Sequence, residues 1–428
     1  MKVEIKERIE QVRRGEISNQ YRRTRAGIMP EDWIKTEPLK AANLFRNHTN
    51  KKHGGAFEVL SVTQDRGIIP RTEVDIDIKY AEENISGYKK VDDGDFVISL
   101  RSFQGGIEYS EYEGLVSPAY TVLKPIRSIV NDYYKAYFKT EDFISRLNAT
   151  VYGIRDGKQV GYEDFGELVL HYPPTDEQEK IAEILTHCDT VIELKKQFIE
   201  EKRRQKKYLM QNLLNPDKGV RLPGFEGKWL KKTLRTLCTE IIDGDWIESK
   251  DQSDSGIRLI QTGNIGIGSF LDKFERAKYI SEDTFARLHC TEVLNGDILI
   301  SRLPDPIGRA CIISSRKERA ITAVDCSIVR LKAKLVAEYF IQYACSDAYF
   351  KQIAVLSGGS TRTRISRKEI EKLKISLPGD IKEQIAISTI LSTADREIDL
   401  LEQELTQWQA KKKSLMQLLL TGLVRVKI

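Results

Sequence analysis

The sequence predicts an α+β fold with two globular mixed α/β domains separated by two long helices, which pack as an antiparallel coiled coil and form a pseudo-two-fold internal repeat. The decapeptide "KKYLMQNLLN" at 206–215 returns as "KKSLMQLLLT" at 412–421. Sliding the sequence on itself by 206 positions aligns 177–214 with 383–420 without a gap, and 16 of these 38 pairs are identical. Similarity at one fixed offset indicates an internal duplication.

The composition is typical of a chain with more than one globular domain. Its 428 residues are too many for a single ordinary core, and no run is apolar enough to predict a membrane helix. The six cysteines form no CxxC pair, and the five histidines show no metal-ligand spacing. We therefore predict no metal site, no disulfide framework and a reducing cytoplasmic location. Basic residues cluster at 195–207 and 362–374, where they either face solvent or contact phosphate.

The repeated segments predict two long amphipathic helices. Apolar residues in each alternate at steps of four and three, which is the heptad pattern of a coiled-coil seam. Lys195, Lys202 and Lys206 interrupt the apolar stripe of the first helix, so its middle is predicted to be the weaker part of the seam. The predicted seam residues are Ile181, Leu185, Ile192, Ile199, Ile387, Leu391, Ile398, Leu405 and Trp408.

Both helices have recognisable start signals. Prolines precede each one, in "HYPPTDEQ" at 171–178 and "SLPGDIKEQ" at 376–384, and Asp176 or Asp380 is placed to cap the first turn. Because two similar amphipathic helices most simply bury their stripes against each other, we expect an antiparallel pair.

The segments before the helices predict two related α/β domains. "VDDGDFVISLRSFQGG" at 91–106 matches "VLNGDILISRLPDPIGRA" at 293–310, and Asp95 and Asp297 each follow a turn glycine and precede a short apolar strand. β-Branched runs broken by Gly, Asp and Asn are typical of short strands. The predicted boundaries are 1–170 and 217–375 for the domains, and 171–216 and 376–428 for the helical segments.

Nearly the whole chain resembles the specificity subunit of a Type I DNA restriction-modification system. The similarity rests on "PPTDEQEKIAEIL" and "IKEQIAISTIL" at the helix starts, "LMQNLL" and "LMQLLL" at their ends, "LPGFEGKW" opening the second domain, and the two "GD" motifs. In that family, two target recognition domains alternate with two conserved helical regions. The first 20 residues depart from the repeat, because nothing of similar character precedes Trp229.

The resemblance implies a non-catalytic subunit that needs no cofactor. Each target recognition domain would read one half of a split target in double-stranded DNA, and the paired helices would hold the domains at a fixed gap. The helices would also dock two modification (methyltransferase) subunits, and restriction (ATP-dependent translocase/nuclease) subunits would join the complex. No membrane partner is implied.

The residue types that read base edges are Arg, Lys, Asn and Gln on loops that can enter the major groove. For any one such residue, a surface position without a DNA contact is the alternative interpretation. The predicted DNA-contacting residues are Arg66, Arg101, Gln104 and Lys158 in the first domain, and Gln261, Asn264, Arg302, Arg309, Thr361, Arg362 and Arg364 in the second.

Two other classes of function stay open on the sequence. A coiled-coil adaptor would also carry duplicated heptad helices, but it would not need two large, diverged domains with loop arginines. A stand-alone DNA methyltransferase or nuclease would need motifs that are missing: Tyr172 stands where the amino-methyltransferase signature has Asn or Asp, and no GxxxxGK[ST] sequence occurs. We predict no catalytic residues.

Overall fold

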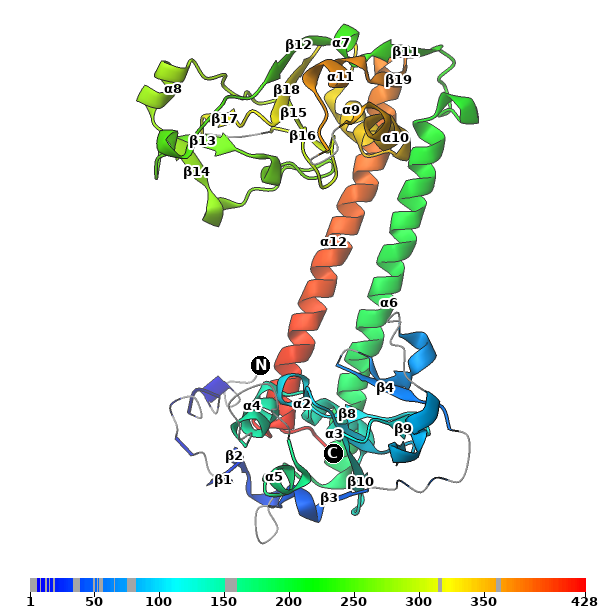
Figure 1. The fold of residues 1–428 in the computed structure, drawn as a ribbon, viewed down its shortest axis with the longest axis vertical. Helices are drawn as coiled ribbons and strands as arrows, with labels where there is room; N and C mark the ends of the chain where they lie inside the picture. Colours follow the sequence, from blue (N-terminus) through cyan, green and yellow to red (C-terminus); the bar gives the residue numbers. More distant parts are fainter. Residues whose placement is uncertain are drawn as a thin grey trace. The chain divides into compact units, whose positions relative to one another are not determined.

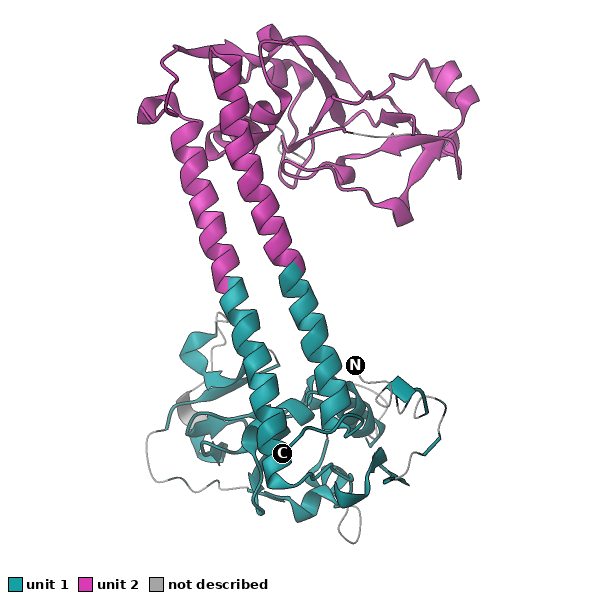
Figure 2. Ribbon diagram, turned by 180° about the vertical axis from the view of Figure 1, so that it is seen from behind, with its two compact units in different colours: residues 1–196, 404–428 teal, residues 197–403 magenta. Residues whose placement is uncertain are grey.

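The computed structural model forms two compact units (Figure 2). Unit 1 comprises residues 1–196 and 404–428, and unit 2 comprises residues 197–403. The structure describes residues 6, 7, 9–11, 14, 16, 17, 20–33, 39–48, 51, 53, 57–64, 66–74, 82–150, 160–314, 318–358 and 363–428. Lys158, Thr361 and Arg362, which were predicted to contact DNA, lie outside the described residues. In the described ranges, no helix is both long and apolar enough to cross a membrane.

Two long helices, α6 (Thr175–Leu213) and α12 (Ile381–Leu420), each contribute one part to each unit (Figures 1 and 2). The Asp380 carboxylate accepts the backbone N–H of Lys382 and caps α12 as predicted. At α6 the prediction is off by two residues, because the carbonyl of Pro174 already accepts the Gln178 N–H and starts the helix before Asp176.

Cross-helix ion pairs show that the two helices run antiparallel within each unit. As residue numbers rise along α6, the numbers of the partners on α12 fall. The pairs are Asp189–Lys412 and Lys195–Glu404 in unit 1, and Lys202–Glu397 and Lys206–Asp395 in unit 2. The three lysines that interrupt the apolar stripe of α6 are therefore each paired with an acidic residue of α12, and charge bridges the part of the seam that the sequence predicts to be weak.

Most of the predicted seam residues are buried. Two positions of α12 are half-buried, Leu405 and Trp408, and the Nζ atom of Lys411 lies 4.3 Å from the centre of the Trp408 ring. The buried members are Ile181, Leu185, Ile192, Ile199, Ile387, Leu391 and Ile398.

Unit 1 is built around an antiparallel four-stranded sheet in the order β3-β10-β7-β8. These strands are β3 (Phe45–Asn47), β10 (Thr121–Pro125), β7 (Phe96–Ile98) and β8 (Glu108–Tyr109). The paired ribbons are β1 (Tyr21–Thr24) with β2 (Gly27–Pro30), β4 (Leu60–Thr63) with β5 (Gly67–Pro70), and β6 (Lys89–Val91) with β9 (Gly114–Val116). Its shorter helices are α2 (Ser102–Gly105), α3 (Asn131–Tyr137), α4 (Glu141–Ala149) and α5 (Tyr162–Gly166), with 3-10 turns at Glu31–Trp33, Ala41–Asn43, Arg71–Glu73 and Glu82–Gly87.

Unit 2 contains a four-stranded sheet in the order β12-β18-β15-β16 and a second sheet in the order β14-β13-β17. The strands are β12 (Cys238–Asp243), β13 (Ile257–Ile260), β14 (Lys278–Ile280), β15 (Ile298–Ser301), β16 (Ala310–Ile312), β17 (Ala320–Thr322) and β18 (Cys326–Leu331), and β11 (Trp229–Thr233) pairs with β19 (Lys374–Pro378). The shorter helices are α7 (Leu234–Leu237), α8 (Glu282–Leu288), α9 (Ala337–Ala344), α10 (Asp347–Leu356) and α11 (Arg367–Lys372), with 3-10 turns at Pro216–Lys218, Ser249–Asp251, Thr262–Asn264 and Phe274–Arg276.

Each domain core includes residues of both long helices. In unit 1, Leu185 and Leu419 belong to the same apolar cluster as the aromatic residues around Phe45. In unit 2, Leu213 and Ile387 belong to the largest apolar cluster, together with residues of β15 and α9. The burial of these apolar side chains fixes the helix ends to the domains and stabilises both.

The "GD" motif forms the same turn in both units. The Asp95 carboxylate accepts the backbone N–H of Asp92 at 3.0 Å, and the Asp297 carboxylate accepts that of Leu294 at 2.8 Å. The preceding glycine has φ = 94° in each case, a left-handed conformation that glycine adopts without strain. The predicted duplication of the domains therefore holds at the level of individual hydrogen bonds.

The first turn of each long helix is fixed by a buried amide. The Oε1 atom of Gln178 accepts the backbone N–H of Val130 at 3.0 Å, and that of Gln384 accepts the backbone N–H of Val336 at 2.9 Å. Both glutamines are completely buried, so each helix is tied to its domain by a hydrogen bond shielded from water.

A buried glutamate precedes each of these glutamines. Glu177 pairs with Arg425, which follows α12, and accepts the indole N–H of Trp33 at 2.8 Å. Glu383 pairs with Arg221, which follows α6. The segment after one long helix thus neutralises the buried carboxylate that starts the other, as a buried charge requires.

Candidate nucleic-acid interface

The described candidates of the first domain lie on two neighbouring segments of unit 1. Arg66 is in the turn between β4 and β5, where its guanidinium pairs with Glu73 at 2.9 Å. Arg101 and Gln104 are exposed, at the start of α2 and within it. The side-chain amide of Gln64 donates to the backbone carbonyl of Arg101 at 3.1 Å and joins the two segments.

Two glycines follow Gln104, at positions where neighbouring segments come close to the backbone. A Cβ atom at Gly105 would lie 2.7 Å from the Gln64 side chain, and one at Gly106 would lie 2.1 Å from the Phe138 carbonyl oxygen. Lys139 donates to the carbonyl of Gly105 at 3.0 Å and pairs with the buried Glu108, so it supports the loop from below. Arg101 and Gln104 are consequently exposed on a loop whose backbone these contacts hold in place.

In unit 2, Arg302 follows β15 and is buried. Its Nε atom donates to the carbonyl of Ile365 at 3.0 Å, and its Nη1 atom pairs with the Asp243 carboxylate at 2.8 Å. Because these donors already have protein partners, the structure favours a structural role for Arg302 over the predicted base contact.

Arg309 also has a structural role, at the other end of the same loop. Its three guanidinium nitrogens donate to backbone carbonyls, including those of Thr262 at 2.8 Å and Pro306 at 2.9 Å. Asn264 is buried beside it and accepts the backbone N–H of Gln261 at 3.0 Å. Arg309 and Asn264 are thus buried and hydrogen-bonded within unit 2, whereas Gln261 is half-exposed, and the contacts of these residues with DNA stay a prediction.

Arg364 remains accessible. Its side chain is 43% exposed and pairs with Asp325 at 2.8 Å, while the N–H of the following Ile365 bonds to the carbonyl of Arg302. Arg302 and Arg309 thus hold segments 364–365 and 262–265 against the loop that follows β15. The described candidates of this domain come together around one loop, and two of them, Arg302 and Arg309, hold this loop in place through hydrogen bonds to backbone carbonyls.

Exposed aromatic residues in unit 2 were not among the predicted candidates. Trp246 is 71% exposed in the loop after β12, and Phe274 is 70% exposed in the loop between β13 and β14. Aromatic side chains can stack on nucleic-acid bases. Their position in loops rich in Gly, Asp and Lys is the signal by which the sequence could have indicated them.

The end of α6 borders a groove of about 700 Å³ in unit 2. Apolar residues Met210 and Leu214 line it together with Lys206, Lys207 and Lys351. α10 and α12 supply the other walls, so the repeated "KKYLMQNLLN" segment faces a space with both apolar and basic character.

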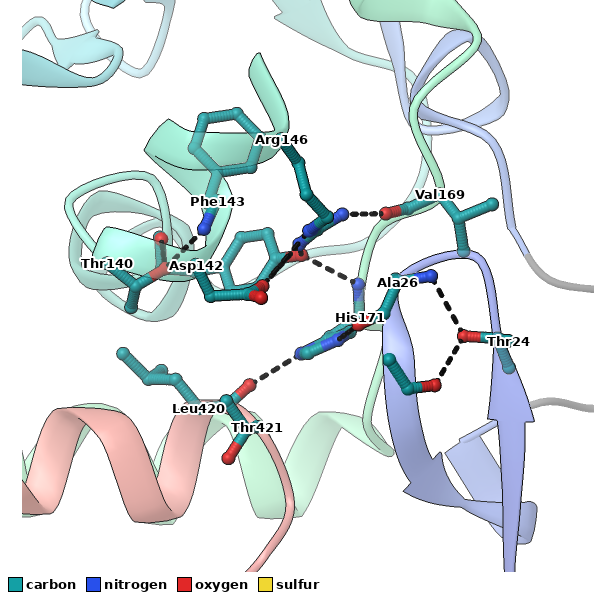
Figure 3. Close-up of polar contacts among 12 residues, drawn as sticks. Thr24, Ala26, Thr140, Asp142, Phe143, Arg146, Val169, His171, Leu420 and Thr421 are labelled. Carbon is teal, nitrogen blue, oxygen red and sulfur yellow. Dashed lines mark hydrogen bonds and ion pairs between the residues drawn. The ribbon is translucent and has the colours of Figure 1, made fainter. Parts of the chain in front are cut away.

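His171 is a buried ionisable group beside the end of α12 in unit 1 (Figure 3). Its Nδ1 atom is 2.7 Å from the carbonyl oxygen of Leu420, and its Nε2 atom is 3.3 Å from that of Ala26. Burial lowers the pKa of His171, so the neutral imidazole is favoured. Arg146 donates to the hydroxyl of Tyr137, which accepts the backbone N–H of His171, and this network is structural.

Among the residues that the structure describes, no group of three or more His, Cys, Asp or Glu side chains could hold a metal ion. The cysteines are free, and burial raises the pKa of Cys238 and Cys326 to about 12. These thiols are thereby kept in their unreactive protonated form.

Two segments of the chain, 39–202 and 226–408, match the family of Type I restriction modification DNA specificity domains. Similar curated proteins come from Methanocaldococcus jannaschii. The Type I restriction enzyme MjaVIII specificity subunit is 25% identical over 79% of this chain and 80% of its own length. The putative Type I restriction enzyme MjaX specificity subunit is 27% identical over 95% of this chain and 97% of its own length.

Solved structures share the fold. A chain from a study of complex assembly and conformational transition of the Type I R-M system superposes with a TM-score of 0.59 at 14% identity, covering 96% of this chain and all of that one. The S subunit of a Type I system from M. genitalium gives a TM-score of 0.52 at 13% identity, with 91% and 96% covered. The HsdS subunit from Thermoanaerobacter tengcongensis gives 0.50 at 14% identity, with 96% and 98% covered.

Proposed function

The chain belongs to the family of Type I restriction-modification DNA specificity subunits, and from this premise we propose that it reads a bipartite DNA target with a fixed, unread gap. Specificity subunits are the non-catalytic, DNA-recognising components of their complexes. One half-site is assigned to residues 39–170 of unit 1 and the other to residues 226–375 of unit 2.

The observation that carries the proposal is the duplication of the same loop-bearing sheet. β3-β10-β7-β8 in unit 1 and β12-β18-β15-β16 in unit 2 have the same order, and the loop after β7 or β15 follows the same "GD" turn. The scaffold is repeated, while the loop residues differ: Arg101 and Gln104 in one, and Gln261 and Arg364 around the other. Two similar scaffolds with different loops suit two different half-sites.

The length of the helices supports a fixed gap. At 1.5 Å per residue, the 39 residues of α6 extend about 58 Å. Duplex DNA rises about 3.4 Å per base pair, so this length corresponds to at most about 17 base pairs. Overlap of the helix ends with the domains shortens that reach.

The same helices are the proposed docking surface for two modification subunits. In unit 2, exposed charged residues of α6 and α12 flank the groove that Met210 and Leu214 line. Segment 412–421 carries the same residue types as 206–215, so a second, equivalent modification subunit is expected in unit 1. The exposed residues assigned to this surface are Glu200, Glu201, Arg203, Arg204, Glu397 and Gln403, with the half-exposed Glu402. Restriction subunits would join this assembly, which would act on DNA in the cytoplasm.

Long-read methylome sequencing of the source cell, with and without the gene for this chain, tests the proposal. We expect methylation at a motif of two short words separated by an unread gap, and its loss in the deletion strain. Methylation at one continuous word, or no change on deletion, would contradict the proposal.

A gel shift with purified protein separates the remaining classes of function. We expect DNA binding that is strengthened by the modification subunits and no methylation by the chain alone. An adaptor would bind no DNA, and a stand-alone enzyme would act without partners.

A further inference from the structure

Arg258 is a buried arginine whose hydrogen-bonding capacity is largely unused. It lies on β13, the central strand of the sheet β14-β13-β17, and only 2% of its surface is exposed. Among the described residues, its Nε and Nη1 atoms have no hydrogen-bond partner. Its Nη2 atom is 3.4 Å from Asp272 Oδ1 and 3.5 Å from the carbonyl oxygen of Lys273, which are long contacts for a guanidinium group.

Arg309, in the same unit, is a buried arginine with a structural role, and its hydrogen bonding differs from that of Arg258. It is 8% exposed, and its Nε, Nη1 and Nη2 atoms all donate to backbone carbonyls. A buried donor without a partner is costly, and a buried charge is normally paired. Arg258 therefore requires a different explanation from Arg309.

The position of Arg258 is nevertheless well fixed. β13 pairs with β14 on one side and β17 on the other, so its backbone is held on both edges. The guanidinium lies 5.5 Å from the centre of the ring of Tyr279, its cross-strand neighbour. Stacking on an aromatic ring orients the group without using its N–H donors.

The cover over Arg258 is a short exposed segment. Residues 271–276 are all exposed, including Phe274 at 70%, and Leu271 is the residue that ties the segment to Asn264. Two long hydrogen bonds connect residues 272–276 with Arg258. They run from the Nη2 atom of Arg258 to the Asp272 carboxylate and to the Lys273 carbonyl. Asp272 is the residue whose carboxylate forms an ion pair with Arg258, at 3.4 Å.

We propose that Arg258 is a latent phosphate-binding residue, and that a DNA backbone phosphate replaces Asp272 when segment 272–276 moves aside. This inference rests on the proposed DNA-binding function. Removing Asp272 from Nη2 exposes adjacent N–H donors of a planar guanidinium, which match the oxygens of a phosphate. Lys273 and Arg276 belong to the same segment. Once the segment has moved, their positive side chains would lie along the DNA backbone.

The first test compares Arg258→Met and Arg309→Met in the full chain bound to its modification subunits. Met removes the charge and keeps an apolar stem. We expect Arg258→Met to leave the thermal melting temperature unchanged or raised, since it removes an underpaired buried charge. Arg309→Met should lower the melting temperature, since it leaves several carbonyls unpartnered.

DNA binding is measured with a fluorescent duplex carrying the methylated motif and with a random-sequence duplex. A phosphate contact predicts that Arg258→Met weakens binding to both duplexes, by about tenfold, and lowers the slope of log K against log salt by about one. Arg258→Lys should restore the slope, because it restores the charge.

Asp272→Asn supplies the decisive second measurement. If Asp272 competes with phosphate, this variant should bind both duplexes several-fold more tightly, and the gain should vanish when Arg258→Met is added. Unchanged affinity and salt slope in Arg258→Met, or an Asp272→Asn gain that persists without Arg258, overturns the inference. So does a loss of modification-subunit assembly with DNA binding intact, which would assign Arg258 to a protein partner. If the wild-type complex binds neither duplex, the proposed function fails instead.

Discussion

Arg302 and Arg309 flank one loop of unit 2, and each fastens a different neighbouring segment to it. Arg302 bonds to the carbonyl of Ile365, and Arg309 bonds to those of Thr262 and Ile265. Arginine is suited to this because its planar group can serve several acceptors at once. A loop fixed in this way would let accessible neighbours, the half-exposed Gln261 and the exposed Arg364, meet DNA with little loss of conformational freedom.

His171 distinguishes unit 1 from unit 2 at the residue scale. At the repeat offset of 206, its counterpart in unit 2 is Leu377, which is also buried. Where unit 2 has an apolar contact, unit 1 has an imidazole between the carbonyl oxygens of Leu420 and Ala26 (Figure 3). The contact of α12 with unit 1 therefore depends in part on a buried histidine, whose neutral form, favoured by burial, can donate to one of these two carbonyl oxygens.

This dependence predicts a pH effect on stability. Burial lowers the pKa of His171 below its ordinary value of about 6.5, so the unfolded chain binds a proton at a pH where the folded chain does not. The contribution of His171 to stability is complete above about pH 6.5 and declines as the pH falls, by at most about 1.4 kcal/mol per pH unit.

We expect His171→Leu to be less stable at pH 7.5, by roughly 1–3 kcal/mol, because it loses the bond to Leu420. Its stability should fall less than that of the wild type between pH 7.5 and 5.5. Urea unfolding at several pH values measures this, and His187→Gln, on the exposed face of α6, is the control that should keep the wild-type pH dependence. Parallel pH profiles for His171→Leu and the wild type would refute the assignment.

At the element scale, the helix pair is joined by repeated ion pairs. Lys206–Asp395 in unit 2 and Asp189–Lys412 in unit 1 are equivalent at the repeat offset. The Lys206 side chain is 16% exposed, so its ion pair is shielded more than an ordinary surface pair. The Asp395 carboxylate also accepts a hydrogen bond from the side-chain amide of Gln342 at 2.8 Å. The Oε1 atom of Gln342 has no hydrogen-bond partner among the described residues.

Reversing one charge of this pair should destabilise unit 2. Lys206→Glu places two carboxylates together, and we expect it to cost about 1–3 kcal/mol. Adding Asp395→Lys should recover most of the loss, since the introduced ammonium group can donate to the new carboxylate at position 206 and to the Oε1 atom of Gln342.

Thermal unfolding of the two variants measures the effect. The control is Arg203→Met, which removes a pair with Glu402 whose side chains are 52% and 43% exposed and should change stability by about 0–1 kcal/mol. A double variant no more stable than Lys206→Glu would show that Lys206 and Asp395 are not coupled.

At the scale of the whole molecule, the proposed function makes the helix pair a spacer. α6 passes from unit 1 to unit 2 between Lys196 and Gln197. α12 passes from unit 2 to unit 1 between Gln403 and Glu404. Inserting one heptad at each of these points preserves the seam and lengthens each helix by about 10 Å.

We expect this double insertion to lengthen the unread gap of the target by about one to three base pairs and to leave both half-sites unchanged. Methylome sequencing of a strain that carries the variant checks the expectation. A variant with unpaired seams, made by inserting the heptad in α6 alone, is the matched control and should lose methylation. An altered half-site in the double insertion would contradict the spacer role.

The sequence by itself determined the architecture, because that architecture depends on periodicity and duplication, which are local and countable. The heptad stripes predicted α6 and α12, which lie within the predicted helical segments 171–216 and 376–428, and the shared "GD" motifs located equivalent turns. The offset of 206 also relates Thr140 to Ser346, which cap α4 and α10 with the same hydrogen bond, although their surroundings have diverged.

Only the tertiary structure decided which polar residues are accessible. Arg101, Arg302 and Arg309 occupy similar loop sequences, yet the first is exposed and the other two are buried. The difference comes from carbonyl groups of segments tens of residues away, such as Ile365 and Thr262, which no local pattern reveals. For the same reason, the sequence predicts a weak seam at the three lysines of α6, whereas the structure pairs each of them with an acidic residue of α12. Burial and pairing depend on long-range contacts, whereas helix and turn formation depends chiefly on near neighbours.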